Sequence, residues 1–143
     1  MTTPSSVSIR VTRRFTASAE TVFDAWIDPQ IAGRFLFAAP TGQMVKAEID
    51  ARVGGKFNFT DRREGDDVEH VGEYLEIDRP RRLVFKFVVP KYSQIWTRVA
   101  VEIVPLASDC ELALTHEGVL PEYESRSVEG WTMILGKLAG VVE

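Results

Sequence analysis

The stretch SVEGWTMILGKLAGVVE, residues 127–143, decides the fold. Its apolar residues recur at spacings of three and four, which places them on one side of an α-helix: Val128, Trp131, Leu135, Leu138 and Val142. The glycines fall away from this stripe: Gly130, Gly136 and Gly140. Each glycine costs a helix roughly 1 kcal/mol relative to alanine, so we expect the helix to depend on a surface that covers its stripe.

The preceding sequence supplies that surface. Alternating apolar and polar residues predict six consecutive strands, separated by short turns: Met44–Ile49, Lys56–Thr60, Val68–Ile77, Leu83–Val89, Ile95–Val104 and Glu111–His116. A further strand is predicted at Val7–Phe15. Strands joined by short turns favour an antiparallel meander, here of about seven strands.

Two short helices are expected between the first strand and the rest of the sheet. Ser18 is placed as the N-cap of a helix over Ala19–Ile27, which ends at Asp28 because the residue before a proline avoids helical geometry. A second helix is predicted from Gln30 to about Phe35, followed by a turn at AAPTG, residues 38–42. This order predicts an α+β fold, with helices at one face or end of an antiparallel sheet.

The composition limits the class of protein. A chain of 143 residues fits one domain over residues 1–143, with residues 1–6 flexible. The net charge of -4 disfavours nucleic acid and an anionic membrane as partners. Cys110 is the single cysteine, and neither a secretory signal nor a run of ~20 apolar residues is present, so a cytoplasmic location is expected.

Five motifs in order resemble a known family: SAETVFDAWIDPQIAGRF, IDARVGGKFNF, GEYLEIDRPRRLVFKF, LALTHEG and GWTMILGKLA. They are similar to the homologues of the activator of heat-shock protein 90 ATPase, within the START-like (SRPBCC, polyketide cyclase and lipid-transfer) superfamily. The resemblance implies a START-like domain with a helix-grip fold, in which a curved sheet grips the C-terminal helix and commonly leaves an apolar cavity. Phe35-Leu36 stands where the family usually has Trp-Phe, and Asp109-Cys110-Glu111 where a Gly-Thr pair is common.

Aromatic residues are the main candidates for a ligand site. Pockets are mostly apolar with a few polar groups, and aromatics on the inner face of a sheet opposite a helix can form such walls. The same residues could instead fill an ordinary core. The candidate set is Trp26, Phe35, Phe37, Phe57, Phe59, Tyr74, Phe85, Phe87, His116, Trp131 and Leu135. Trp96 is expected on the outer face of the sheet.

His116 is the main polar candidate. It shares the parity of Leu112 and Leu114, so it should point inward near the end of the last strand. There it could orient a ligand or act as a general base. The favoured alternative is a structural histidine hydrogen-bonded to the loop before the final helix.

Three functions remain open. The first is a non-catalytic protein that binds a small apolar or aromatic molecule, and it is favoured. The second, implied by the resemblance, is a co-chaperone that activates a heat-shock protein 90 type ATPase. The third is a cyclase or hydrolase that uses His116. No cofactor and no metal are expected, because no residues stand at metal-ligand spacing and no phosphate-binding glycine loop is present. A homodimer through edge strands or Trp96 is left open.

Overall fold

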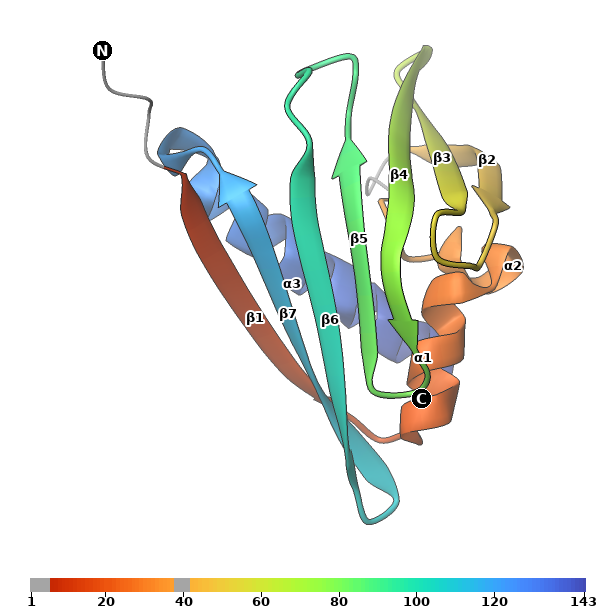
Figure 1. The fold of residues 1–143 in the computed structure, drawn as a ribbon. Coiled ribbons are helices and arrows are strands. Elements are labelled where there is room, and N and C mark those ends of the chain that lie inside the picture. The colour runs from red at the N-terminus through yellow and green to blue at the C-terminus, as the bar shows by residue number, and fades with distance from the viewer. Residues whose placement is uncertain (1–5, 38–41) are drawn as a thin grey trace.

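In the computed structural model, which describes residues 6–37 and 42–143, seven strands form one antiparallel sheet in the order β1-β7-β6-β5-β4-β3-β2 (Figure 1). The strand bounds are β1 Val7–Phe15, β2 Gln43–Ile49, β3 Lys56–Arg63, β4 Asp66–Asp78, β5 Arg82–Val88, β6 Thr97–Leu106 and β7 Asp109–Val119. Figure 1 shows α3, Glu124–Val142, running behind the curved sheet. The predicted helix-grip architecture is confirmed.

Strand parity buries one side of each central strand against the helices. Phe57 and Phe59 on β3, and Leu83, Phe85 and Phe87 on β5, are all buried, as their alternation predicts. Phe57 lies opposite Gly72 on β4, and its ring occupies the space where a side chain of residue 72 would begin. The sheet therefore presents a continuous apolar face to α3.

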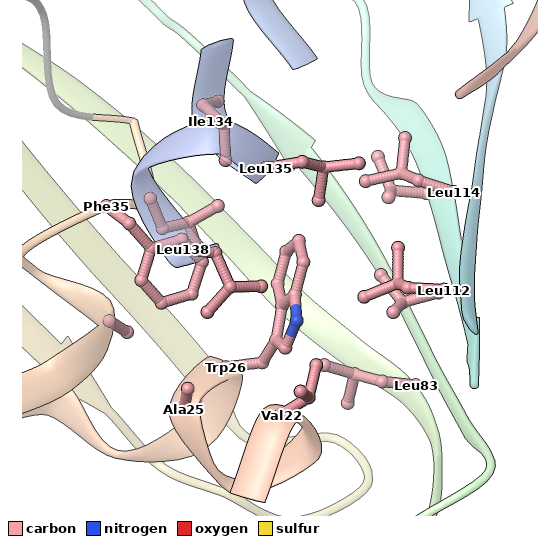
Figure 2. Packing of buried hydrophobic residues seen from close by; sticks show 14 of the residues in the cluster. Val22, Ala25, Trp26, Phe35, Leu83, Leu112, Leu114, Ile134, Leu135 and Leu138 are labelled. Atoms are coloured by element: carbon pink, nitrogen blue, oxygen red, sulfur yellow. The ribbon is translucent and has the colours of Figure 1, made fainter. Parts of the chain in front are cut away.

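The helix α1, Ala19–Ile27, has the predicted bounds. The Ser18 hydroxyl oxygen accepts a hydrogen bond from the backbone N–H of Thr21 at 3.2 Å, which caps the first turn. Its buried side includes Val22 and Trp26, whose indole lies among side chains of α3, β5 and β7 (Figure 2). This helix closes one end of the space between α3 and the sheet.

The second helix is shorter than predicted. It spans Pro29–Ala32 as α2, where we expected Gln30 to about Phe35, and Gly33 ends it. The next three apolar residues, Phe35, Leu36 and Phe37, are all buried. Consecutive residues on a helix point in divergent directions, so the chain must leave the helix to bury all three. The predicted turn at residues 38–42 and the expected flexible residues 1–6 lie almost entirely outside the described residues.

The predicted strand Ile95–Val104 begins two residues too early, since β6 starts at Thr97. Before it the chain makes a turn: the Tyr92 and Ser93 N–H groups both donate to the Val89 carbonyl oxygen, at 2.9 and 3.0 Å. Trp96 is 47% exposed, with the Lys86 ammonium 5.2 Å from its ring centre. It therefore lies outside the core, as expected, although in a loop.

The stripe of α3 is shifted from the predicted one. Trp131, Leu135 and Leu138 are buried as expected, but Val128 is 38% exposed, so its place on the buried stripe was wrong. Ile134 and Ala139 are buried in addition. Near the start of the helix Ser127 and Gly130 line an open hollow, and Val128 lies outside that hollow and faces solvent. Gly130, Gly136 and Gly140 lie off the buried stripe, as predicted, with open space at each where a Cβ would stand.

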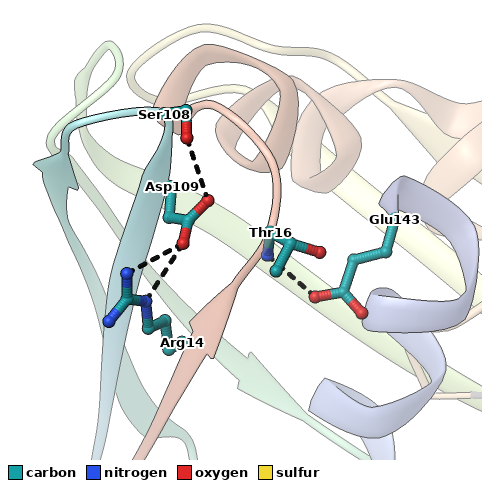
Figure 3. Close-up of polar contacts among 5 residues, drawn as sticks. All are labelled: Arg14, Thr16, Ser108, Asp109 and Glu143. Carbon is teal, nitrogen blue, oxygen red and sulfur yellow. Dashed lines mark hydrogen bonds and ion pairs between the residues drawn. The ribbon is translucent and has the colours of Figure 1, made fainter.

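Polar contacts join segments distant in sequence at the other end of α3. The Glu143 carboxylate accepts a hydrogen bond at 2.8 Å from the Thr16 backbone N–H, between β1 and α1 (Figure 3). Nearby, the Arg14 guanidinium on β1 donates to the Asp109 carboxylate at the start of β7, at 2.9 and 3.2 Å (Figure 3). These contacts fix the end of α3 and the β1–β7 edge at the closed end of the fold.

Candidate ligand-binding site

An open hollow of about 550 Å³ lies between the ends of β5 and β7 and the start of α3, and we call it the larger hollow. Three segments form its walls: the end of β5 with the loop to β6, the end of β7 with the following 3-10 helix η1 (Pro121–Tyr123), and the first turn of α3. Its lining is Phe87, Val88, Val89, Tyr92, Ser93, Ile95, Thr97, His116, Gly118, Val119, Leu120, Tyr123, Arg126 and Ser127. Apolar side chains predominate, with hydroxyl, imidazole and guanidinium groups among them.

A second hollow of about 190 Å³, the smaller hollow, adjoins it toward β3 and β4. The two share Phe87, Val89, His116 and Ser127 as lining. The smaller hollow is also lined by Phe37, His70, Gly130, Trp131 and Ile134. Together they form one recess at the end of the grip opposite α1.

A chain of hydrogen bonds crosses the boundary between the hollows. The Trp131 indole N–H, on α3, donates to His116 Nδ1, on β7, at 3.0 Å. An indole can only donate, so Nδ1 is the accepting nitrogen and the neutral ring carries its proton on Nε2. Nε2 then donates to the Thr97 hydroxyl, on β6, at 2.7 Å. The favoured alternative, a structural histidine, agrees with this geometry, but its partners are α3 and β6 and not the loop before the helix.

Both histidines of the recess are neutral at pH 7. Burial lowers the pKa of His116 to about 4. Burial also lowers the pKa of His70 to about 4, and the positive charge of Arg63 adds to that effect. His70 Nδ1 lies 3.2 Å from the Phe59 carbonyl oxygen and donates to it. The recess therefore offers polar but uncharged imidazole groups.

Phe37 forms the floor between the recess and the core. Its ring stacks on His70 with centres 4.5 Å apart, and lies 5.1 Å from Phe87 and 5.9 Å from Trp131. Its φ of 60° is in the left-handed region, an uncommon conformation for a bulky residue. Such backbone strain persists where surrounding packing fixes it and is concentrated at functional sites.

The candidate site residues fall into two groups in the structure. Phe87 and His116 line both hollows, and Phe37 and Trp131 line the smaller one. The others lie in the core and line neither hollow: Trp26, Phe35, Phe57, Phe59, Tyr74, Phe85 and Leu135. Trp26 and Phe35, for example, make an edge-to-face contact with centres 5.3 Å apart. The Phe37 ring lies between Trp131 and the strand that carries Phe57 and Phe59, with its centre 5.9 Å from Trp131, 6.3 Å from Phe57 and 5.8 Å from Phe59.

Most residues that line the larger hollow could not be predicted from the sequence, because loops form much of its wall. Tyr92 and Tyr123 lie in segments for which no strand or helix is predicted, and Ile95 was assigned to the start of a strand although it lies in the loop before β6. Arg126 and Ser127 precede or begin the sequence predicted as the final helix. The loop sequence YSQIW, with three large apolar residues, was the available signal, since loops are ordinarily polar.

Some chemistries find no support within the parts of the chain that the structure describes. There, no group of three or more histidine, cysteine or acidic side chains is positioned to hold a metal ion. No helix among these residues has the length and hydropathy to cross a bilayer.

Most of the chain matches the model of one protein family. The family model described as "Activator of Hsp90 ATPase homolog 1-like protein" matches residues 16–143. No curated protein sequence matches the chain.

Several solved structures share the fold. A Chromobacterium violaceum protein is 24% identical, with a TM-score of 0.82 over 95% of this chain and 96% of that one. A Staphylococcus aureus protein of unknown function is 16% identical, with a TM-score of 0.86 over 97% and 94%. CalU16 from Micromonospora echinospora is 22% identical, with a TM-score of 0.75 over 96% and 77%. Similarity at these identities establishes the fold alone.

Proposed function

The chain belongs to the family of Activator of Hsp90 ATPase homolog 1-like proteins, and from that premise we propose that it binds a small apolar or aromatic molecule in the larger hollow. One observation carries the proposal: the fold leaves about 550 Å³ of mostly apolar space at one end, while its other end is packed. That volume lies within the range of roughly 300–1,000 Å³ typical of small-molecule sites.

The lining fits such a ligand. Phe87, Val89 and Leu120 offer apolar contact, and the rigid Trp131–His116–Thr97 chain presents fixed polar groups beside it. Because the hydrogen bonds are already made in the free protein, a ligand pays little entropy to organise them. The site residues proposed here are Phe37, Phe87, His116 and Trp131 from the original set, with the loop residues of the larger hollow. A cytoplasmic location remains part of the proposal.

A fluorescent apolar probe tests this function. Phenylnaphthylamine emits strongly in apolar surroundings and should bind the wild-type protein with saturation at one site. Ser127→Trp fills the space from a half-buried position that lines both hollows, so it should abolish binding while the melting temperature stays near that of the wild type.

Ser125→Trp provides the matched control. Ser125 is exposed on the same turn of α3 and lines neither hollow, so this variant should bind the probe as the wild type does. Equal binding by Ser127→Trp and the wild type, or no saturable binding by the wild type, would contradict the proposal.

A second candidate is activation of a chaperone ATPase, which the family description suggests. Tyr92, Ile95 and Trp96 are 66%, 56% and 47% exposed on one loop, and large apolar side chains of this kind dominate protein interfaces. The same surface could instead join two copies of this chain. An increased ATPase rate of a heat-shock protein 90 type chaperone, lost in Trp96→Ala, would support activation; an unchanged rate on titration with the wild type would exclude it.

Catalysis by His116 has the least support. Both ring nitrogens are already engaged by Trp131 and Thr97, so neither is free to exchange a proton with a substrate without breaking one of these hydrogen bonds.

A further inference from the structure

Arg126 gives the larger hollow a charge. Its exposed side chain lines the hollow from the first turn of α3. Among the described residues of that lining it alone carries a formal charge at pH 7, because His116 is neutral there. The guanidinium group thus lies beside a mostly apolar space.

Among the described residues, Arg126 has no partner for its charge. Across residues 6–37 and 42–143, no side chain or backbone group forms a hydrogen bond or ion pair with the Arg126 guanidinium. Three glutamates are close in sequence, Glu122, Glu124 and Glu129, but all are exposed and line neither hollow. Several other arginines do have such a partner: Arg14, Arg62 and Arg79 each pair with a carboxylate at 2.7–2.9 Å.

The position of Arg126 is also unfavourable for the helix that carries it. α3 begins at Glu124, so the cation lies in the first turn, where the positive end of the helix dipole repels it. Neither the helix dipole nor an ion pair among the described residues therefore stabilises a positive charge at this position. An anion bound in the hollow would stabilise it.

We propose that the ligand of the larger hollow is an amphipathic anion: an apolar or aromatic body with one carboxylate or sulfonate group. This rests on the proposed function and names the class of molecule that the same site takes. The body packs against Phe87, Val89 and Leu120, while the acidic group meets the Arg126 guanidinium, whose planar donors match a carboxylate or sulfonate in a paired arrangement. The Ser127 hydroxyl, next in the chain, is a further donor at the same wall.

Two dyes of one skeleton test the proposal. Anilinonaphthalene sulfonate carries a sulfonate, and phenylnaphthylamine is its neutral parent. The wild-type protein should bind the sulfonate more tightly than the parent. Arg126→Gln should weaken sulfonate binding about tenfold and leave parent binding within about twofold, since a hydrogen bond to a charged group contributes on the order of a tenfold change in affinity or more. Arg126→Lys should recover part of the loss, because it keeps the charge without the planar donors.

Controls separate this effect from general changes in charge or folding. Arg10→Gln removes another exposed arginine, on β1, that lines neither hollow, and it should leave both affinities unchanged. Arg126→Gln should melt at the wild-type temperature or slightly above it, because it removes a cation from a helix start. Raised salt should weaken sulfonate binding to the wild type more than to Arg126→Gln.

The outcomes distinguish the inference from the proposed function. If Arg126→Gln weakens binding of the sulfonate alone, both stand. If the wild type binds both dyes equally, or if Arg10→Gln weakens the sulfonate as much as Arg126→Gln does, the anionic class is wrong and an apolar site remains. If the wild type binds neither dye, both are wrong.

Discussion

At the scale of single residues, His116 and Trp131 determine each other's polar chemistry. The indole donates to Nδ1 at 3.0 Å, so protonating that nitrogen would bring two N–H groups face to face. The ring is only 6% exposed, so water can compensate for little of this lost hydrogen bond. Burial and this fixed donor both oppose the imidazolium form, as burial does at His70.

This opposition predicts a pH dependence of stability. In the folded state each histidine has a pKa of about 4, against the ordinary value of 6.5. As the pH falls below 6.5, the two histidines bind protons in the unfolded chain but not in the folded one. The free energy of unfolding therefore decreases until about pH 4. The full loss is on the order of 3 kcal/mol for each histidine. Urea unfolding at several pH values measures it.

The variants His116→Gln and His70→Gln show how much each histidine contributes to the change of the free energy of unfolding with pH. Each removes one titrating group, so each should flatten the decrease between about pH 6.5 and pH 4 relative to the wild type, whatever its own stability at neutral pH. Asp24 and Glu143 have lowered pKa values, from hydrogen bonds with Arg79 and with Thr16 respectively. Their contributions are lost only below the ordinary values of 3.8 and 4.5, at the acidic edge of this window or beyond it. An unchanged slope in both histidine variants would refute the assignment.

At the scale of elements, two glycines affect the stability of their elements in opposite ways. Gly136 lies in the interior of α3 with open space where a Cβ would stand. Gly72 lies in β4 under the Phe57 ring, and a Cβ there would also come within 2.7 Å of the Lys86 carbonyl oxygen. The first glycine weakens its helix without a packing reason, whereas the second makes room for an aromatic ring of the core.

Alanine at the two positions should therefore change stability in opposite directions. Gly136→Ala should raise the free energy of unfolding by about 0.5–1 kcal/mol, because alanine has less conformational freedom to lose on folding. Gly72→Ala should lower it by about 2 kcal/mol or more, because Phe57 must move and neighbouring core residues with it. Urea unfolding of both variants checks the prediction. If Gly72→Ala left the free energy of unfolding unchanged, the Phe57 ring would be able to move aside at no cost, which would contradict the prediction.

The elements could be predicted where periodicity and caps agree. α1 was placed to the residue because Ser18 and Asp28-Pro29 mark its ends, and strand parity placed Phe57, Phe59, Phe85 and His116 on the inner face. α2 and Val128 were misplaced because burial there depends on what lies opposite. Periodicity gives the face of a residue but not its partner across the core. It therefore could not separate the packed end of the interior from the open one.

At the scale of the whole molecule, the interior has two parts. α1 closes one end, where Trp26 packs among residues of α3, β5 and β7, and Leu112 is fully buried (Figure 2). At the other end β5, β7 and α3 enclose the recess. α3 and β7 run through both parts: Leu138 and Leu112 belong to the packed end, Trp131 and His116 to the open one. The packed end can thus stabilise the fold while the open end exposes apolar surface to a ligand.

This division predicts that stability and binding can be separated by mutation. Leu112→Ala deletes buried methyl groups from the packed end, so it should lower the free energy of unfolding by about 2–5 kcal/mol. It should leave the Kd of phenylnaphthylamine for the folded protein unchanged, because Leu112 lines neither hollow. Ser127→Trp should do the reverse. Urea unfolding and dye titration below the melting transition measure the two quantities on the same samples. If Leu112→Ala weakened dye binding as strongly as it destabilised the fold, packing at the α1 end would control the recess, and the interior would have to be treated as one coupled unit.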